Sequence, residues 1–147
     1  KWIADHAELY PDETFVISGG ALKNVVPDEL KKIQTLKNII LAGYLSDGQV
    51  KSLYENCKAF VFPSYFEGFG LPPLEALSCG SPIIISRDAS LPEIYGDCAH
   101  YIDSSNPDVD LDKLLEESVK PADELFKKYS FEKSAKELYK ILTDLQF

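Results

Sequence analysis

The chain has 147 residues, of which 45% are hydrophobic and 27% charged, a balance typical of one globular domain with its own core. Its net charge of −9 and its single arginine, Arg87, argue against a nucleic-acid surface or a cluster of phosphate-clamping arginines. Three cysteines, Cys57, Cys79 and Cys98, fit no metal-ligand spacing, and we expect buried, reduced thiols in a cytoplasmic protein. No stretch reaches the ~18 apolar residues of a membrane span.

In chain order, short apolar runs alternate with helical patterns. Because the runs are apolar almost throughout, they predict strands covered on both faces, at 14–18, 39–42, 59–62, 82–86 and 99–102. Helices are predicted at 4–10, 46–57, 73–79, 90–95, 111–118, 121–129 and 131–145. This alternation predicts right-handed crossovers and an α/β, Rossmann-like, doubly wound parallel sheet of about five strands.

Local signals support several of these helix boundaries. Ser46 with Gln49, and Ser90 with Glu93, have the spacing of a capping box, in which two polar side chains satisfy the first backbone amides of a helix. Gly80 is a suitable left-handed residue after the helix at 73–79.

The segment after the third predicted strand is the most unusual in the chain. Gly68 and Gly70 flank Phe69, so the backbone can turn sharply and approach a ligand closely. The loop then enters a helix through two successive prolines, which donate no N–H. The free N–H groups of Phe69, Gly70 and Leu71 therefore gather at the positive end of that helix, which predicts an anion site built from backbone. In a doubly wound sheet, ligands bind at this edge, beyond the carboxyl ends of the strands.

Two carboxylates bracket that predicted anion site. Glu67 lies in the loop, and we expect Glu75 in the first turn of the helix. A carboxylate at the position of Glu75 can accept two hydrogen bonds from vicinal hydroxyls such as those of a ribose. Glu67 is placed to face the group that is attached to the bound anion. Either glutamate alone is compatible with an ordinary loop or helix-start acid, but the pair at this spacing favours a binding site.

At these residues the chain resembles a known family. Residues 63–90, reading PSYFEGFGLPPLEALSCGSPIIISRDAS, are similar to the signature of group 1 (family 4) glycosyltransferases of the GT-B fold, with the E-x₇-E element running from Glu67 to Glu75. The flanking blocks at 38–53 and 91–103 are similar too, and the resemblance covers roughly residues 14–145. It implies one half of a GT-B fold, with 1–147 as the nucleotide-sugar-binding C-terminal domain and the N-terminal acceptor domain outside this chain.

The resemblance also implies an activity, retaining transfer of a sugar from a nucleotide donor to a carbohydrate or lipid-linked acceptor, in polysaccharide or glycolipid assembly. Glu67 would be the catalytic residue and would contact donor hydroxyls. The other implied donor-binding residues are Gly68, Phe69, Gly70 and Leu71 for sugar and diphosphate, Glu75 for ribose, and Tyr44 and Leu45 beside the nucleobase. No metal or other cofactor, and no nucleic acid, is expected. The implied location is the cytoplasm, with the longer protein peripheral at the inner face of the membrane.

One departure from the family pattern bears on diphosphate binding. Family members carry a Gly-Arg/Lys…Lys-Gly segment just before the first helix of this domain, and in this chain that segment would lie upstream of Lys1. Two alternatives to the enzyme domain stay open: a non-catalytic sugar-nucleotide-binding module, and a GT-B sugar-nucleotide epimerase, which generally lacks the E-x₇-E block.

Other signals favour structural explanations. The D-x-D at 108–110 opens a predicted helix, so capping explains it better than a metal site. His6 and His100 are expected to be ordinary surface or half-buried histidines. Arg87 ends a strand on the ligand side and is more simply a solvated loop residue than a phosphate contact. Gly19 and Gly20 either allow close approach of a ligand or only form a turn.

Overall fold

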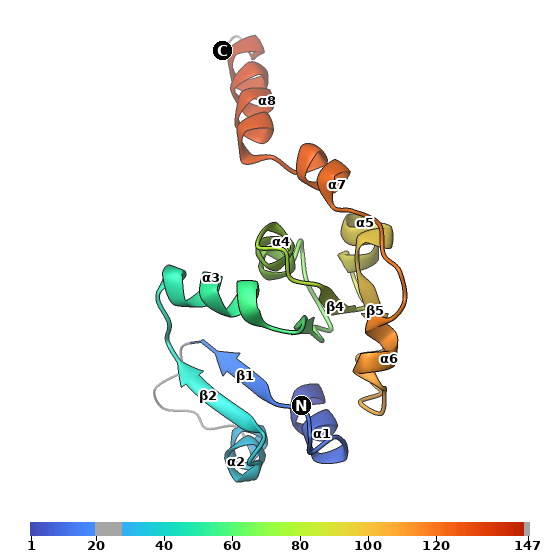
Figure 1. Cartoon of the computed structure of the whole chain (residues 1–147). Helices are drawn as coiled ribbons and strands as arrows, with labels where there is room; N and C mark the ends of the chain where they lie inside the picture. The colour runs from blue at the N-terminus through green and yellow to red at the C-terminus, as the bar shows by residue number, and fades with distance from the viewer. Residues whose placement is uncertain (20–27, 146–147) are drawn as a thin grey trace.

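The structure is a computed structural model and describes residues 1–19 and 28–145 (Figure 1). The strands are β1 (Phe15–Ser18), β2 (Ile39–Gly43), β3 (Phe60–Phe62), β4 (Ile83–Ser86) and β5 (His100–Ile102). The helices are α1 (Trp2–Leu9), α2 (Asp28–Thr35), α3 (Asp47–Asn56), α4 (Leu71–Ser78), α5 (Leu91–Tyr95), α6 (Leu111–Leu115), α7 (Asp123–Lys128) and α8 (Phe131–Asp144), with a 3₁₀ turn at Gly96–Cys98. None of the described helices is long and apolar enough to cross a membrane.

The five predicted strands are confirmed, but they do not form one continuous sheet. β1 pairs in parallel with β2, and β3, β4 and β5 form a second parallel sheet in that order. β1 and β3 have no hydrogen bonds to each other in the described structure, because a cavity separates their facing edges. The prediction of a single five-stranded sheet is therefore corrected to two parallel sheets of two and three strands.

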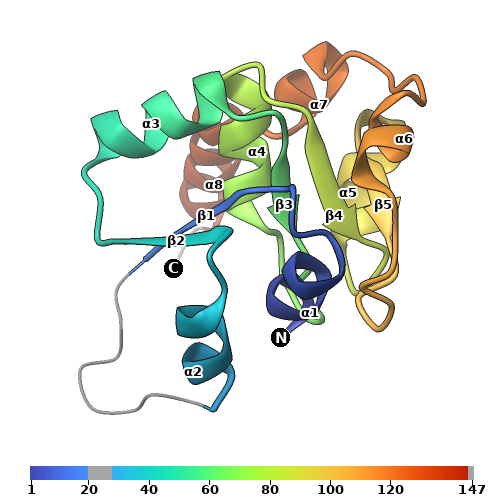
Figure 2. The same cartoon turned by 60° about the horizontal axis from the view of Figure 1, so that its bottom comes forward.

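The helices cover both faces, as a doubly wound arrangement requires (Figure 2). β4 lies in the middle of its sheet and is buried throughout. Ile83 and Ile85 point into a core formed with α4, α5 and α7, whereas Ile84 points into a second core shared with Trp2 of α1 and Leu111 of α6. A third core joins α1 and α2 to the β1–β2 sheet. Burial of these apolar side chains is the main force that holds the layers together.

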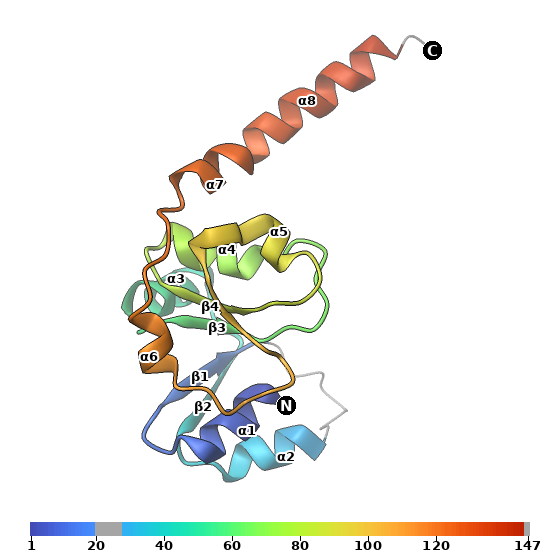
Figure 3. The same cartoon turned by 90° about the vertical axis from the view of Figure 1, so that its right-hand side faces the viewer.

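The expectation that every strand is covered on both faces is wrong for β1 and β2. Val16 of β1 and Ile40 of β2 are 46% and 51% exposed, so these strands are not covered on both faces. The reason is that α3, the helix nearest that face, has no buried residue of its own. The last helix, α8, confirms the prediction at 131–145 but extends away from the sheets (Figure 3).

Candidate functional site

The junction between β3 and α4 is shaped by one glycine. Gly70 caps α4 with a left-handed backbone, at φ 77°. A Cβ atom at this position would lie 2.8 Å from Cδ2 of Leu91. Gly70 therefore meets two requirements at once, a positive φ and space for close packing, that no other residue meets.

The backbone amides at this junction are available to a ligand. Within the described residues, the N–H groups of Phe69, Gly70 and Leu71 donate no hydrogen bond to another part of the chain. Pro72 and Pro73 follow inside the first turn of α4 and contribute no donors. Three unpaired donors at the positive end of an eight-residue helix are suited to bind an anion, as the sequence predicts.

Side chains from other parts of the chain contact the loop that carries these amides and fix its position. The Tyr95 hydroxyl donates a hydrogen bond to the Gly70 carbonyl, and the Phe69 ring packs edge-on against Tyr129, with centroids 5.0 Å apart. The Ser90 hydroxyl donates to the Glu67 carbonyl oxygen at 2.8 Å. Ser90 therefore does not form the predicted capping box with Glu93; its hydroxyl fixes the loop instead.

The two glutamates sit in different environments. Glu67 is half-buried, and its Oε1 accepts a hydrogen bond from the Ser64 hydroxyl at 2.9 Å. Glu75 is exposed and occupies the fifth position of α4, two positions further along than predicted, because the helix begins at Leu71 and not at Pro73. The sequence analysis missed Ser64, Ser90 and Tyr95 as supports of this loop, since nothing in their spacing distinguishes them from ordinary core or capping residues.

The charges of the two glutamates act on two tyrosines, the half-buried Tyr54 and the buried Tyr95. Burial, together with the charge of Glu75, raises the pKa of Tyr54 on α3 to about 12. Burial also raises the pKa of Tyr95, and the negative charges of Glu67 and Glu75 add to that increase. Both phenols therefore ionise only at a higher pH than an ordinary tyrosine.

The predicted nucleobase contacts lie on a different loop. Tyr44, which is 86% exposed, and the half-buried Leu45 lie between β2 and α3. The start of α3 is fixed by the predicted capping pair, because Ser46 N donates to Gln49 Oε1 at 3.0 Å. No hydrogen bond in the described part of the chain joins residues 44–45 to the 64–75 segment. Gly19 has a positive φ of 143°, and Gly20 lies outside the described residues.

The alternative metal motif is explained by capping. Asp110 caps α6 by accepting a hydrogen bond from Lys113 N at 2.9 Å, and Asp108 accepts one from the Tyr10 hydroxyl at 2.9 Å. Within residues 1–19 and 28–145, no group of three or more His, Cys, Asp or Glu side chains is arranged to hold a metal ion.

Both histidines are more buried than predicted. His6 is fully buried between the stacked rings of Trp2 and Tyr10, with Nδ1 2.7 Å from the Pro107 carbonyl and Nε2 2.9 Å from Glu13. His100 is also buried, in β5. His6 therefore packs within a group of aromatic rings and His100 within a strand, and neither is a surface histidine.

Two further expectations are resolved by the surroundings of the side chains. The three cysteines are free thiols, as predicted, but all are half-buried, not buried. Arg87 is exposed, as predicted, and its guanidinium also lies 4.8 Å from the centroid of the Tyr101 ring. This cation–π contact holds the arginine against β5.

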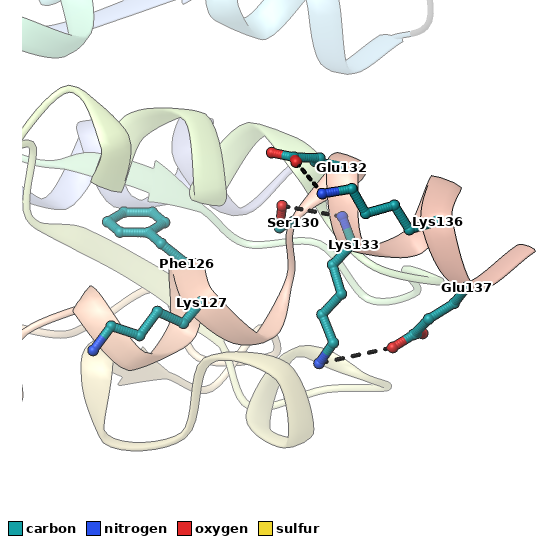
Figure 4. Close-up of a pocket in the computed structure, with 7 residues that line it drawn as sticks. All are labelled: Phe126, Lys127, Ser130, Glu132, Lys133, Lys136 and Glu137. Carbon is teal, nitrogen blue, oxygen red and sulfur yellow. Dashed lines mark hydrogen bonds and ion pairs between the residues drawn. The ribbon is translucent and has the colours of Figure 1, made fainter.

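The chain also has an open pocket of about 570 Å³ between α7 and α8 (Figure 4). Its rim includes two ion pairs within α8, Glu132 with Lys136 and Lys133 with Glu137. Within each pair the two opposite charges cancel. None of the predicted donor-binding residues lines this pocket. The loop–helix junction at 64–75 therefore remains the better candidate site.

Comparison with known proteins decides the family. The family described as "Glycosyl transferases group 1" matches residues 3–130, which include the whole loop–helix junction. The chain belongs to this family. Its parallel α/β architecture accordingly corresponds to a Rossmann-like half of a GT-B glycosyltransferase.

Several curated relatives of this group 1 domain carry functional names. The serotype-specific mannosyltransferase WbdA of Escherichia coli is 45% identical over 80 residues, covering 49% of this chain and 10% of the relative. The O-antigen chain mannosyltransferase B of Escherichia coli is 47% identical over 66 residues, covering 45% of this chain and 17% of the relative. An uncharacterized glycosyltransferase of Methanocaldococcus jannaschii is 28% identical over 146 residues, covering 88% of this chain and 37% of the relative. The group 1 domain thus spans well under half the length of these relatives.

Proposed function

We propose that this chain is the donor-binding domain of a retaining glycosyltransferase that uses a nucleoside-diphosphate sugar. The observation that carries the proposal is the pair Glu67 and Glu75 on either side of three unpaired amides at the start of α4. The amides bind the diphosphate, Glu75 accepts hydrogen bonds from the ribose, and Glu67 faces the sugar. Family membership favours this function over an epimerase or a non-catalytic module.

The comparisons favour one class of donor. WbdA, O-antigen chain mannosyltransferase B and a mycobacterial α-(1→4)-mannosyltransferase are all named for mannosyl transfer. We therefore propose a hexosyl donor, with a mannosyl nucleotide as the first to test, and a carbohydrate or lipid-linked acceptor in surface-glycan assembly. The acceptor is bound by a further domain of the longer protein.

The main chemical requirement of the proposed reaction is stabilisation of the leaving group. When the glycosidic bond breaks, negative charge develops on the nucleoside diphosphate, and preorganised N–H donors stabilise that charge without rearranging. The half-buried Glu67, fixed by Ser64, holds the sugar hydroxyls as positive charge develops on the ring. Because amides and a helix terminus carry out this stabilisation, the proposed reaction uses no divalent metal.

A binding screen followed by an activity assay tests the function. Nucleoside diphosphates with different bases are titrated into the chain by NMR, and we expect shifts at the amides of Phe69, Gly70 and Leu71 for one of them. The longer protein is then incubated with the matching mannosyl nucleotide, and sugar transfer or hydrolysis is measured. Binding without turnover would leave only the non-catalytic module, and epimerised donor would indicate the epimerase.

The metal requirement is tested in the same assay. Adding a chelator to the longer protein should leave its rate unchanged within about twofold. A tenfold or greater loss that magnesium or manganese restores would show that a metal, not the amides alone, stabilises the leaving diphosphate.

A further inference from the structure

Three loops meet at the edge of the sheet where the proposed donor site lies. The strands β3, β4 and β5 are parallel and lie side by side in that order, so the loops that follow them are neighbours beyond their carboxyl ends. These loops are residues 63–70, 87–90 and 103–110. Glu67 lies in the first of them, and the other two carry none of the residues proposed to bind the donor.

Side-chain hydrogen bonds join all three loops. The Tyr65 hydroxyl donates to the Ser104 carbonyl oxygen at 2.7 Å, and the Ser104 hydroxyl donates to the Asp88 carboxylate. In the same turn as Asp88, the Ser90 hydroxyl donates to the Glu67 carbonyl oxygen at 2.8 Å. Because Glu67 and Tyr65 belong to one loop, the path returns to its start. These five residues form a closed set, which we call the inter-loop network.

Most of this network is shielded from water. Ser104 is 5% exposed, and Glu67, Asp88 and Ser90 are half-buried. Tyr65 is 56% exposed, so its hydrogen bond to Ser104, more than apolar packing, fixes the position of its hydroxyl. Hydrogen bonds that are shielded from water are electrostatically stronger than exposed ones, and connected bonds reinforce one another.

The turn at the centre of the network is strained. Ala89, at φ 50°, is the only residue other than glycine with a positive φ in the described part of the chain. This conformation is unfavourable for an L-residue and persists only where the surroundings impose it. The neighbours of Ala89 on either side, Asp88 and Ser90, are the residues that bond to the other two loops. The network therefore supplies the constraint, and strain of this kind is typical of functional sites.

We propose that the inter-loop network positions Glu67 for the sugar transfer proposed above, on which this inference rests, with Tyr65, Asp88 and Ser104 as positioning residues. The Ser90 hydroxyl fixes the Glu67 main chain, and the other links fix the three loops against one another. A charged group that is held in place before the substrate binds stabilises the transition state without rearranging. A displacement of about 1 Å can lower the rate about 10²-fold.

The amides that bind the diphosphate have a separate support. The Tyr95 hydroxyl donates to the Gly70 carbonyl, and neither residue belongs to the inter-loop network. Damage to the network should therefore lower kcat and leave nucleoside diphosphate affinity nearly unchanged. Residues that only stabilise the fold would not separate these two quantities.

Two single variants break different links of the network. Tyr65→Phe removes only a hydroxyl from an exposed side chain, so the fold should be retained, and Asp88→Ala removes the acceptor of the Ser104 hydroxyl. In the longer protein each should lower kcat about tenfold, with nucleoside diphosphate affinity changed less than about threefold. Asp88→Asn keeps an oxygen acceptor and should recover most of the lost kcat. Tyr139→Phe, which removes a hydroxyl from an exposed tyrosine of α8, is the matched control and should change neither quantity.

The double variant tests whether the links act as one unit. If either break opens the whole network, Tyr65→Phe combined with Asp88→Ala should lower kcat about tenfold, as much as one variant alone. A loss that multiplies to about 100-fold would show two independent supports and overturn the network. Unchanged kcat in both single variants, or equal losses of kcat and affinity, would overturn the positioning role.

The order of the loop tests the network without the reaction. Backbone order parameters of Phe66 and Glu67, measured by NMR relaxation, should fall in Tyr65→Phe and Asp88→Ala and stay unchanged in Tyr139→Phe. Equal order in all variants would overturn the proposal even if kcat falls. An unmodified longer protein that transfers no sugar would refute the proposed function, whereas the network is still judged by these order parameters.

Discussion

Glu75 is exposed on α4, where its carboxylate can accept hydrogen bonds from a ligand, and this predicts the effect of replacing it. Glu75→Gln keeps the size of the side chain but loses the charge, so charge-assisted bonds to a ribose, worth about 1.5–3 kcal/mol, should weaken. Nucleoside diphosphate affinity, measured by calorimetry on the longer protein, should fall about tenfold or more. Glu55→Gln, which alters an exposed glutamate paired with Lys51 on α3, is the matched control and should leave the affinity unchanged.

Glu67 should matter to turnover more than to nucleotide binding. Its carboxylate is held by the Ser64 hydroxyl in the loop, where the proposed function places the reacting sugar. Interactions that strengthen only as the bond breaks lower kcat, not affinity. In the longer protein, Glu67→Ala should reduce kcat by about 10² or more, whereas nucleoside diphosphate affinity should change less than about threefold. Equal loss of binding in both glutamate variants, with kcat retained, would mean that the two roles are misassigned.

The stability of a Gly70 variant tests the geometry of the loop. Gly70→Ala places a Cβ 2.8 Å from Leu91 and forces alanine into a left-handed conformation, which alone costs about 1–3 kcal/mol. Gly80→Ala has a similar positive φ but open space around it, so it measures the strain without the contact. Urea unfolding should show a larger loss for Gly70→Ala than for Gly80→Ala. Equal losses would mean that the Leu91 side chain moves aside freely.

At the scale of elements, the strands were predictable because each is a short apolar run with clear ends. All five were located to within about one residue, and the loop and helix that carry Glu67 and Glu75 were recognised from their glycines and prolines. The helix α2 was missed. Its sequence DELKKIQT is mostly polar and only eight residues long, and Ile33 is its contribution to the core of buried residues, so its apolar stripe is too short to stand out in the sequence.

The arrangement of the elements was less accessible than the elements themselves. An apolar run indicates that a strand is covered, but not which strand lies beside it, so the separation of β1 from β3 could not be read from the sequence. The supports of the loop were hidden for a related reason. Ser90 precedes a helix and has Glu93 at the correct spacing for a cap, yet its hydroxyl binds Glu67, a residue 23 positions away.

At the scale of the whole molecule, two partly buried tyrosines predict that the folded chain loses stability in alkali. The unfolded chain releases tyrosine protons near pH 10. In the folded chain, burial raises the pKa of Tyr54 and of Tyr101 to about 12. The folded state thus binds more protons between these values, and stability that is fully present below pH 10 should decline as the pH rises toward 12.

Urea unfolding at about pH 8, 10 and 11, with phenolate absorbance recorded in parallel, checks this expectation. Tyr54→Phe should reduce the alkaline decline, because one of the shifted phenols is removed. A free energy of unfolding that stays constant to pH 11 in the unmodified chain would contradict it.

The position of Trp2 has a consequence for how the chain folds. Its indole N–H donates to the carbonyls of Asp103 and Asn106, at 3.1 and 2.9 Å, across separations of 101 and 104 residues. Closing a loop of that length costs about 4 kcal/mol of chain entropy, so this contact forms only when the intervening strands already bring the two segments together. Because Trp2 is the sole tryptophan, we expect its fluorescence to report the docking of α1, and to change no earlier than the circular dichroism that reports secondary structure.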